Sequence, residues 1–322
     1  MLAAFAHTVN NDDPISALTV GQRPEPEAKL GWSKIKVKAA SVNHHDLFSL
    51  RGIGLSEKQC PMILGTDAAG VDEDGNEVIV HGLIASEGWR GDETLDPRRT
   101  LLSEKYDGGL AEYISVPKQN LVAKPEGMSW EVAASVGTAY LTAYAMLFGK
   151  ANLVPGQLVV VQGAGGGVAT ATIQLASAAG LRVWAISRSE KKRARAIDLG
   201  AEEAFEPGAR LPEKADVVID NVGAATWSHS VNILRPGGQI IVCGATTGDA
   251  PERAELTKIF FRQLQVIGST FGTKEQLEDM LKFMAAKGIE PVIDSTFPLE
   301  QADKALEKLA SGDFYGKIVV KP

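Results

Sequence analysis

Residues 158–188 read LVVVQGAGGGVATATIQLASAAGLRVWAISR, and this stretch decides the fold. Its first five residues form a short apolar run rich in β-branched side chains, which is typical of a strand buried on both faces of a parallel sheet. A glycine-rich turn follows, then small and apolar residues at 168–179 that predict a helix, and then a second apolar run at 181–187. Gly180 is well placed to end the helix. The stretch therefore predicts one complete strand–loop–helix–strand unit.

The glycine-rich turn is the part of this unit that indicates a ligand. Because glycines lack a side chain, the backbone can turn tightly there, and a pyrophosphate can approach the N–H groups that open the following helix. A glycine run alone can be an ordinary flexible loop, but here the flanking strands and helix occur in the order that a dinucleotide-binding fold requires. The candidate phosphate-binding residues are Gly163, Gly165, Gly166, Gly167 and Val168.

The end of the second strand bears on which dinucleotide would bind. An acidic residue at this place accepts hydrogen bonds from the ribose hydroxyls of NAD, and the sequence has none. It has Ser187 and Arg188, followed by the basic cluster 191–193, which would meet a 2′-phosphate with positive charge. Alternatively, these basic residues are the solvated first turn of a helix at 190–199. We expect NADP(H) as the cofactor, with Ser187, Arg188 and Lys192 near its extra phosphate.

Composition and charge exclude several classes of protein. The 322 residues suffice for two domains, and 44% hydrophobic and 23% charged residues are ordinary for a globular chain. The net charge of −7 argues against a nucleic-acid partner. No apolar stretch reaches the roughly 18–20 residues needed to span a bilayer, and the N-terminus does not look like a signal peptide. We therefore expect a cytoplasmic protein without a membrane partner. Only two cysteines occur, Cys60 and Cys243, far apart in sequence, so neither a disulfide framework nor a multi-cysteine zinc site is available.

Segments before and after the dinucleotide unit carry further motifs. Residues 2–8 and 34–42 read as strands, and VNHHDL at 42–47 precedes PMILGTDAAG at 61–70. In this order, ahead of a dinucleotide fold, the segments resemble the medium-chain dehydrogenase/reductase superfamily. GTDAAG is similar to the family's GHE-type motif, and VGTAYLTAY at 136–144 is similar to its first cofactor-domain helix. Three later segments resemble further family signatures: VIDNVGAATW, LRPGGQIIVCGATTG and GKIVV. The nearest subgroup is the quinone oxidoreductase-like and zinc-binding dehydrogenase-like branch.

The resemblance implies an α/β chain of two domains. A GroES-like, β-rich catalytic domain would comprise residues 1–122 and 291–322, and a Rossmann domain with a doubly wound parallel sheet would comprise 123–290. The family also implies a small-molecule substrate and a homodimer, in which strand 264–269 would pair with its symmetry mate across a sheet edge.

The departures from the family bear on metal binding. In the zinc-dependent relatives the resemblance would place metal ligands where this chain has Asn43, Thr66 and Thr138. Neutral amide and hydroxyl groups are poor zinc ligands compared with thiolate or imidazole, and residues 84–108 lack the cysteines of a structural zinc lobe. We therefore predict no metal. The two histidines and two acids of HHD and GTD are chemically sufficient for an improvised site, but adjacent histidines would point to opposite sides of an extended segment.

Without zinc, the protein must position a hydride acceptor and stabilise its developing charge with hydrogen-bond donors. His45 stands where the zinc enzymes keep a proton-relay hydroxyl, so it is the first candidate proton donor. Asn43 and Asp67 are the other candidate catalytic residues. His44, Thr138 and Thr142 are candidate cofactor contacts. Residues after three further strands, Asn221, Gly244, Ala245, Thr246 and Phe271, are expected near the nicotinamide.

Three functions remain open from the sequence. The first is a zinc-independent, NADPH-dependent reductase of quinones or α,β-unsaturated carbonyl compounds. The second is a metal-using alcohol or aldehyde dehydrogenase with unusual ligands. The third is an NADPH-binding sensor or structural protein without turnover.

Overall fold

The structure is a computed structural model that describes all 322 residues. By contact, the chain divides into two compact units. The first contains residues 1–139, 272–282 and 290–322, and the second contains 140–271 and 283–289. The contacts thus assign 123–139 and 272–282 to the first unit, whereas the sequence led us to expect them in the second.

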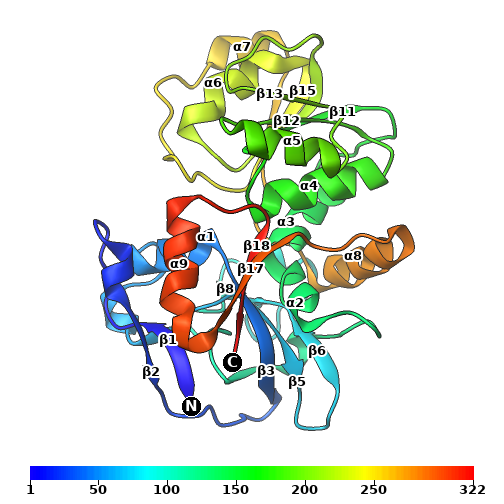
Figure 1. The fold of residues 1–322 in the computed structure, drawn as a ribbon. Helices are drawn as coiled ribbons and strands as arrows, with labels where there is room; N and C mark the ends of the chain where they lie inside the picture. Colours follow the sequence, from blue (N-terminus) through cyan, green and yellow to red (C-terminus); the bar gives the residue numbers. More distant parts are fainter. The chain divides into compact units, whose positions relative to one another are not determined.

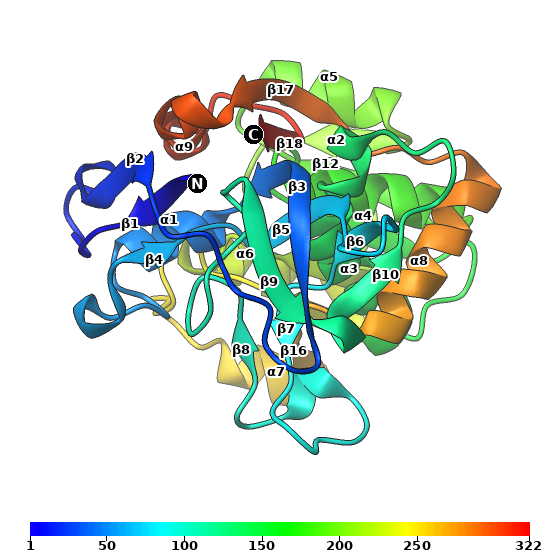
Figure 2. The same cartoon turned by 90° about the horizontal axis from the view of Figure 1, so that it is seen from below.

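The first unit is built on β-sheets, as expected for a GroES-like domain. A three-stranded sheet has the order β2-β1-β4, and a second sheet has the order β10-β6-β5-β3-β18-β17 with β9 also paired to β3. Figure 2 shows β9 beside β3. The strands of this unit are β1 (Leu2–Ala6), β2 (Leu18–Gln22), β3 (Trp32–Val42), β4 (Met62–Ile63), β5 (Asp67–Val71), β6 (Glu77–Val80), β7 (Leu83–Ile84), β8 (Thr100–Leu101), β9 (Tyr113–Pro117), β10 (Leu121–Ala123), β17 (Ile293–Pro298) and β18 (Lys317–Lys321).

Strand β3 is the centre of the first unit because β5, β9 and β18 all pair with it in antiparallel fashion. Its alternating burial places Ile35 and Val37 in the core, while Lys36 is exposed, as a period of two requires. The helices of this unit are α1 (His44–Leu50), α2 (Trp130–Ala133) and α9 (Ala302–Ser311). Leu306 and Leu309 of α9 are buried in the same core. Chain ends that are distant in sequence are thereby joined around β3.

The second unit is a parallel sheet with the strand order β13-β12-β11-β14-β15-β16. Every pairing in it is parallel, which confirms the Rossmann fold expected from the sequence. Helices α4 and α5 contact strands β11 to β13, and α6 contacts β14 and β15 (Figure 1). Its elements are α3 (Leu141–Tyr144), β11 (Leu158–Gln162), α4 (Gly167–Ala178), β12 (Arg182–Ile186), α5 (Glu190–Asp198), β13 (Glu203–Phe205), β14 (Ala215–Asp220), α6 (Ala224–Ile233), β15 (Leu234–Val242), α7 (Leu256–Phe261) and β16 (Gln265–Gly268).

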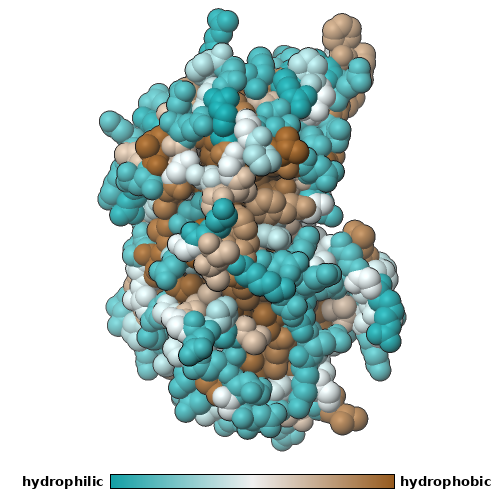
Figure 3. All heavy atoms as spheres, turned by 90° about the vertical axis from the view of Figure 1, so that its right-hand side faces the viewer, coloured by the Kyte–Doolittle hydropathy of each residue, from teal (hydrophilic) through white to brown (hydrophobic).

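Helix α8 (Lys274–Lys287) carries an apolar stripe at helical spacing. Leu277, Met280, Leu281 and Met284 are all buried, so this stripe packs in the core. Figure 3 views the molecule from the side on which α8 lies in Figure 1, and it shows apolar residues interspersed among hydrophilic ones. No helix combines the length and the apolar character that crossing a bilayer requires.

One local expectation from the sequence was wrong. The segment with His44 and His45 is not extended, because Asn43 caps a helix there and both histidines lie in the first turn of α1. The Asp46 carboxylate accepts hydrogen bonds from the backbone N–H groups of Asn43 and Gly65, both at 2.8 Å, and this holds the helix start. The stretch 136–144, which resembles the family's first cofactor-domain helix, is helical: α3 is flanked by π-helical turns at Val136–Tyr140 and Ala145–Lys150.

Candidate functional site

The glycine loop of the second unit has the geometry expected of a dinucleotide site. Gly163 has a positive φ of 79°, which a residue with a side chain rarely adopts, and Gly166 precedes the first turn of α4. A methyl group added to Gly166 would meet no atom within 4 Å, so the backbone there is open to a ligand. The first N–H groups of α4 have no acceptor within the helix. The residues present therefore fit a dinucleotide pyrophosphate.

Lys192 lies against this loop. A methyl group added to Gly165 would come within 3.0 Å of the Lys192 ammonium nitrogen, so the lysine lies beside the glycine loop. Arg193 has a different role, because its guanidinium donates to the carbonyl of Ser187 at 2.8 Å and pairs with Glu206 at 3.2 Å. Ser187 is buried, whereas Arg188 is exposed. Arg188 is therefore exposed just after β12, and Lys192 lies beside the glycine loop.

The loops after β14 and β15 join this edge of the sheet. The Asn221 carbonyl accepts from the Thr246 N–H at 3.4 Å, and the Val222 carbonyl accepts from the Thr247 N–H at 2.8 Å. A methyl group added to Gly163 would lie 3.1 Å from Val222. The predicted residues Asn221, Gly244, Ala245 and Thr246 are therefore neighbours of the glycine loop. Phe271 is buried with a φ of 54°, and Thr142 is buried in α3.

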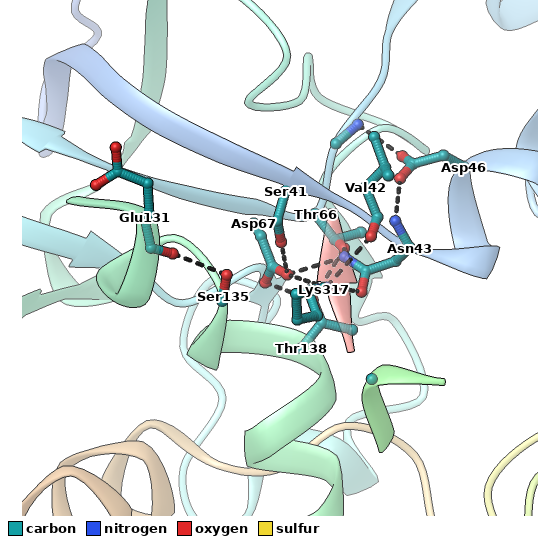
Figure 4. Close-up of polar contacts among 12 residues, drawn as sticks. Ser41, Val42, Asn43, Asp46, Thr66, Asp67, Glu131, Ser135, Thr138 and Lys317 are labelled. Atoms are coloured by element: carbon teal, nitrogen blue, oxygen red, sulfur yellow. Dashed lines mark hydrogen bonds and ion pairs between the residues drawn. The ribbon is translucent and has the colours of Figure 1, made fainter. Parts of the chain in front are cut away.

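The first unit contains a buried polar cluster, which we call the Asp67 network (Figure 4). Its members come from four segments of the chain, and their hydrogen bonds converge on the Asp67 carboxylate. Asp67 Oδ2 accepts from Ser41 Oγ at 2.8 Å, from Asn43 Nδ2 at 2.9 Å and from Lys317 Nζ at 3.2 Å. Asp67 Oδ1 accepts from Thr138 Oγ1 at 2.7 Å. The side chains of Lys317 and Asp67 are only 2% and 1% exposed, so this ion pair is isolated from water.

Thr66 completes the network and was not among the predicted catalytic or cofactor residues. Its hydroxyl lies 3.1 Å from Asn43 Nδ2 and 2.9 Å from Thr138 Oγ1. Lys317 was also missed, although it begins the strand GKIVV in which a charge stands beside apolar residues. Asn43, Asp67 and Thr138 are thus held together by Thr66, which the sequence indicated only as a metal-ligand position of the zinc enzymes, and by Lys317, which it did not indicate.

The Asp67 network occupies the three positions at which the zinc enzymes were expected to carry ligands. Zinc requires thiolate, imidazole or carboxylate donors. Here Asn43, Thr66 and Thr138 offer only neutral oxygens already bonded to one another, and Lys317 already neutralises the single carboxylate. No group of three His, Cys, Asp or Glu side chains is placed so that it could hold a metal ion. The residues present do not fit zinc.

His45 belongs to a second polar group on the same unit. Its Nε2 lies 3.2 Å from Glu104 Oε1, and its Nδ1 lies 3.4 Å from Ser103 Oγ. Glu104 is fixed by the N–H of Leu101 at 2.9 Å. Burial acts to raise the pKa of Glu104, but the hydrogen bonds from His45 and from the Leu101 N–H outweigh it, so this pKa lies below its usual value. An anionic carboxylate therefore faces the imidazole and sets Nε2 as the protonated nitrogen.

Two other titratable groups near these residues are perturbed by burial. Burial raises the pKa of Asp46 above its usual value, although the N–H groups of Asn43 and Gly65 act in the opposite direction. Burial lowers the pKa of His44 below its usual value, and the nearby positive charge of Lys317 acts in the same direction; the His44 ring lies 6.4 Å from that of Phe48. No metal-ligand role follows for either residue.

Comparison with known proteins agrees with the two-unit architecture. Residues 29–126 match the alcohol dehydrogenase GroES-like domain family, and residues 167–286 match the zinc-binding dehydrogenase family. The chain is 30% identical over 319 residues to an acryloyl-coenzyme A reductase of Sulfurisphaera tokodaii, with 93% of this chain and 95% of the relative covered. It is 27% identical over 328 residues to an alcohol dehydrogenase of Geobacillus stearothermophilus, with 94% and 96% covered.

A solved structure extends this likeness to three dimensions. The crystal structure of an NAD-dependent alcohol dehydrogenase superimposes with a TM-score of 0.92 at 31% identity, and the match covers 100% of both chains. The GroES-like unit, the Rossmann unit and these relatives together establish that the chain belongs to the medium-chain dehydrogenase/reductase superfamily of zinc-type alcohol dehydrogenase-like oxidoreductases.

Proposed function

We propose that the chain is a zinc-independent, NADPH-dependent oxidoreductase that reduces quinones or α,β-unsaturated carbonyl compounds. The observation that carries this proposal is the Asp67 network. Lys317 balances the buried carboxylate, and Asn43, Thr66 and Thr138 are bonded to one another where a metal would need anionic or imidazole ligands. An electron-poor acceptor needs less Lewis-acid assistance than a simple aldehyde does.

The residues of the glycine loop and of the end of β12 support NADPH as the cofactor. A bound nicotinamide would supply the hydride, and the protein must position the cofactor and the acceptor for its transfer. The open backbone at Gly166 receives the pyrophosphate at the start of α4. Arg188 and Lys192 supply positive charge at the end of β12, where a carboxylate would be needed to favour NAD.

His45 is the proposed proton donor. Reduction by a hydride leaves a negative charge on the acceptor, and one proton must follow to complete the product. In the neutral form of His45, Glu104 orients Nε2–H and Ser103 faces Nδ1, so the imidazole is held at both nitrogens. Protonation adds the second N–H, and the charged ring is stabilised by the Glu104 carboxylate.

The relatives support an acceptor of this kind. The acryloyl-coenzyme A reductase is named for a substrate whose carbon–carbon double bond is conjugated to a carbonyl group. An activated double bond of that type is one of the two acceptor classes in our proposal, so an enoyl thioester belongs in the substrate panel beside quinones and enones.

The test follows NADPH oxidation by the chelator-treated protein against a quinone, an enone, an enoyl thioester and an aldehyde. We expect turnover of at least one of the first three in the presence of chelator. Aldehyde turnover that returns only when zinc is added would instead establish a metal-using dehydrogenase. Cofactor binding without turnover of any acceptor would favour the sensor or structural role.

The proposal includes a homodimer formed through the second unit. Strand β16 is the last strand of the parallel sheet, and Val266 on it is 49% exposed. Helix α7, which precedes β16, exposes Leu256, Phe260 and Phe261 by 68%, 69% and 81%. An open strand edge beside apolar side chains is suited to pairing with the same edge of a second copy.

A further inference from the structure

Three lysines alternate with apolar residues in KIKVK at 34–38, and two of them have no partner in the protein. Lys34 forms an ion pair with Glu25, and its Nζ lies 4.8 Å from the centre of the Tyr113 ring. Lys36 is exposed and Lys38 is half-buried, and neither forms an ion pair or a side-chain hydrogen bond. Since residues two apart on a strand share a face, both free ammonium groups lie on the same side of β3.

Both of these unpaired lysines line a groove of about 450 Å³ on the first unit. Tyr113 of β9 pairs with Lys36 across the sheet, and Trp130 is the first residue of α2; both line the groove. Glu112 and Lys321 also line it. This volume is in the range of sites that hold a small organic ligand.

The side chains around the groove are positive on balance. Lys321 is neutralised by Glu131, whose carboxylate lies 2.6 Å from its Nζ. The Glu112 carboxylate accepts a hydrogen bond from the Leu2 N–H at 2.6 Å. Two unpaired ammonium groups and this one carboxylate leave an excess of positive charge, which an anion in the groove would balance.

The two aromatic side chains add hydrogen-bond donors to the groove. Neither the Tyr113 hydroxyl nor the Trp130 indole N–H has a partner within the protein. An indole N–H can only donate, and a phenol hydroxyl can donate. The Trp130 ring is held by Lys124, whose Nζ lies 4.9 Å from the ring centre and forms an ion pair with Glu77 at 2.8 Å. The groove therefore combines two ammonium groups with two neutral donors.

We propose that this groove is an accessory binding site for a small phosphate monoester. At neutral pH such a group carries a charge of about −2 and three acceptor oxygens. It therefore matches the ammonium groups of Lys36 and Lys38 and the two neutral donors, whereas a single carboxylate offers one charge and two oxygens. The rings of Tyr113 and Trp130 supply apolar surface for the organic part of the ligand.

The groove is separate from the Asp67 network, although both lie on the first unit. Lys38 precedes Asn43 by five residues of extended chain, which is roughly 16 Å. Lys321 follows Lys317 by four residues of β18, which is roughly 13 Å. A phosphate monoester in the groove therefore does not occupy the candidate catalytic residues, and its binding does not depend on the proposed reduction.

The test is calorimetric titration of the whole chain with phenyl phosphate. We expect the wild type to bind it, and Lys36→Gln and Lys38→Gln each to raise the Kd about threefold to tenfold. The double variant should raise it at least about tenfold, and added salt should weaken binding by the wild type. Benzyl alcohol, which keeps the ring and lacks the charge, should not bind measurably.

Two further variants locate the site. Lys58→Gln removes an exposed lysine elsewhere on the first unit and should leave the Kd unchanged. Lys192→Gln tests the glycine loop of the second unit and should also leave it unchanged. Thermal unfolding establishes that each variant is folded, and the single variants decide the question if the double variant is not.

Three results would overturn the proposal. They are no binding of phenyl phosphate by the wild type, the same Kd in the wild type and the groove variants, and a Kd that rises in Lys192→Gln alone. Turnover does not enter this measurement. Failure of the phosphate site is therefore distinguishable from failure of the proposed reductase function.

Discussion

Lys317 Nζ lies 3.2 Å from Asp67 Oδ2, although 250 residues separate the two in the chain. The pair links β18, the last strand, to β5 near the beginning, and both strands pair with β3. Each charge compensates the other in a place without water, since the two side chains are 2% and 1% exposed. The C-terminal strand is therefore part of the candidate site and not only of the fold.

Removing one partner of this pair should be strongly destabilising. Lys317→Met leaves the Asp67 carboxylate buried without its counter-charge, and we expect a loss of about 3–5 kcal/mol in the free energy of unfolding. The double variant Lys317→Met/Asp67→Asn should recover much of that loss. The control is Lys282→Ala in the exposed pair with Asp279, where we expect almost no change in the free energy of unfolding. Urea unfolding compares them, and equal losses in the buried and exposed variants would contradict the argument.

Gly137 permits the close approach of backbone to the Asp67 network. A methyl group added there would lie 2.9 Å from Asp67 Oδ1 and 3.2 Å from the Val80 carbonyl oxygen. We expect Gly137→Ala to cost about 1–3 kcal/mol, because the carboxylate would have to shift away from Thr138. Gly21→Ala, whose added methyl group meets only ordinary contacts at 3.7 and 3.8 Å, is the matched control. Similar stabilities of the two variants by thermal unfolding would disprove this role.

The sequence predicted the fold better than it predicted the site, and the reason is the range of the interactions. Strands β11 and β12 and the glycine loop are local patterns, so they could be read within 31 residues. Asp67 and Lys317 come into contact only when the chain has folded, and no local sequence pattern predicts this contact. The sequence contains one sign that Lys317 is unusual: its charge stands immediately before the apolar run IVV. The sequence contains no such sign for Glu104, because 59 residues separate it from His45 and it lies in an irregular loop.

His81 should make stability depend on pH. Burial lowers the pKa of His81, whose Nε2 bonds to the Gly272 carbonyl at 2.8 Å. As the pH falls below about 6.5, the unfolded chain binds the proton before the folded chain does, so stability is full above that pH and decreases below it. The decrease attributable to one histidine is at most about 1.4 kcal/mol per pH unit. Urea unfolding at pH 7.5, 6.5 and 5.5 should show a smaller decrease in His81→Gln than in the wild type, and parallel curves would refute the prediction.

Arg188 and Lys192 should distinguish NADPH from NADH. A charge-assisted hydrogen bond to the 2′-phosphate exists only with NADPH, so we expect Arg188→Ala and Lys192→Ala each to raise the Kd for NADPH about tenfold. The Kd for NADH should change much less. Lys191→Ala, which removes an exposed neighbouring charge, is the control for general electrostatics. Fluorescence titration gives the Kd values for NADPH and NADH. An equal increase in both would mean that these residues do not recognise the 2′-phosphate.

The oligomeric state should depend on the apolar face beside β16. Phe261 on α7 is 81% exposed, and placing a carboxylate there would put like charges together in a symmetric pairing of two copies. We expect the wild type to be a dimer by light scattering coupled to size-exclusion chromatography, and Phe261→Asp to shift it toward the monomer. Leu30→Asp is the matched control, because Leu30 is also an exposed apolar side chain but belongs to the other unit. A wild-type monomer, or dissociation caused equally by both variants, would rule out this edge as the interface.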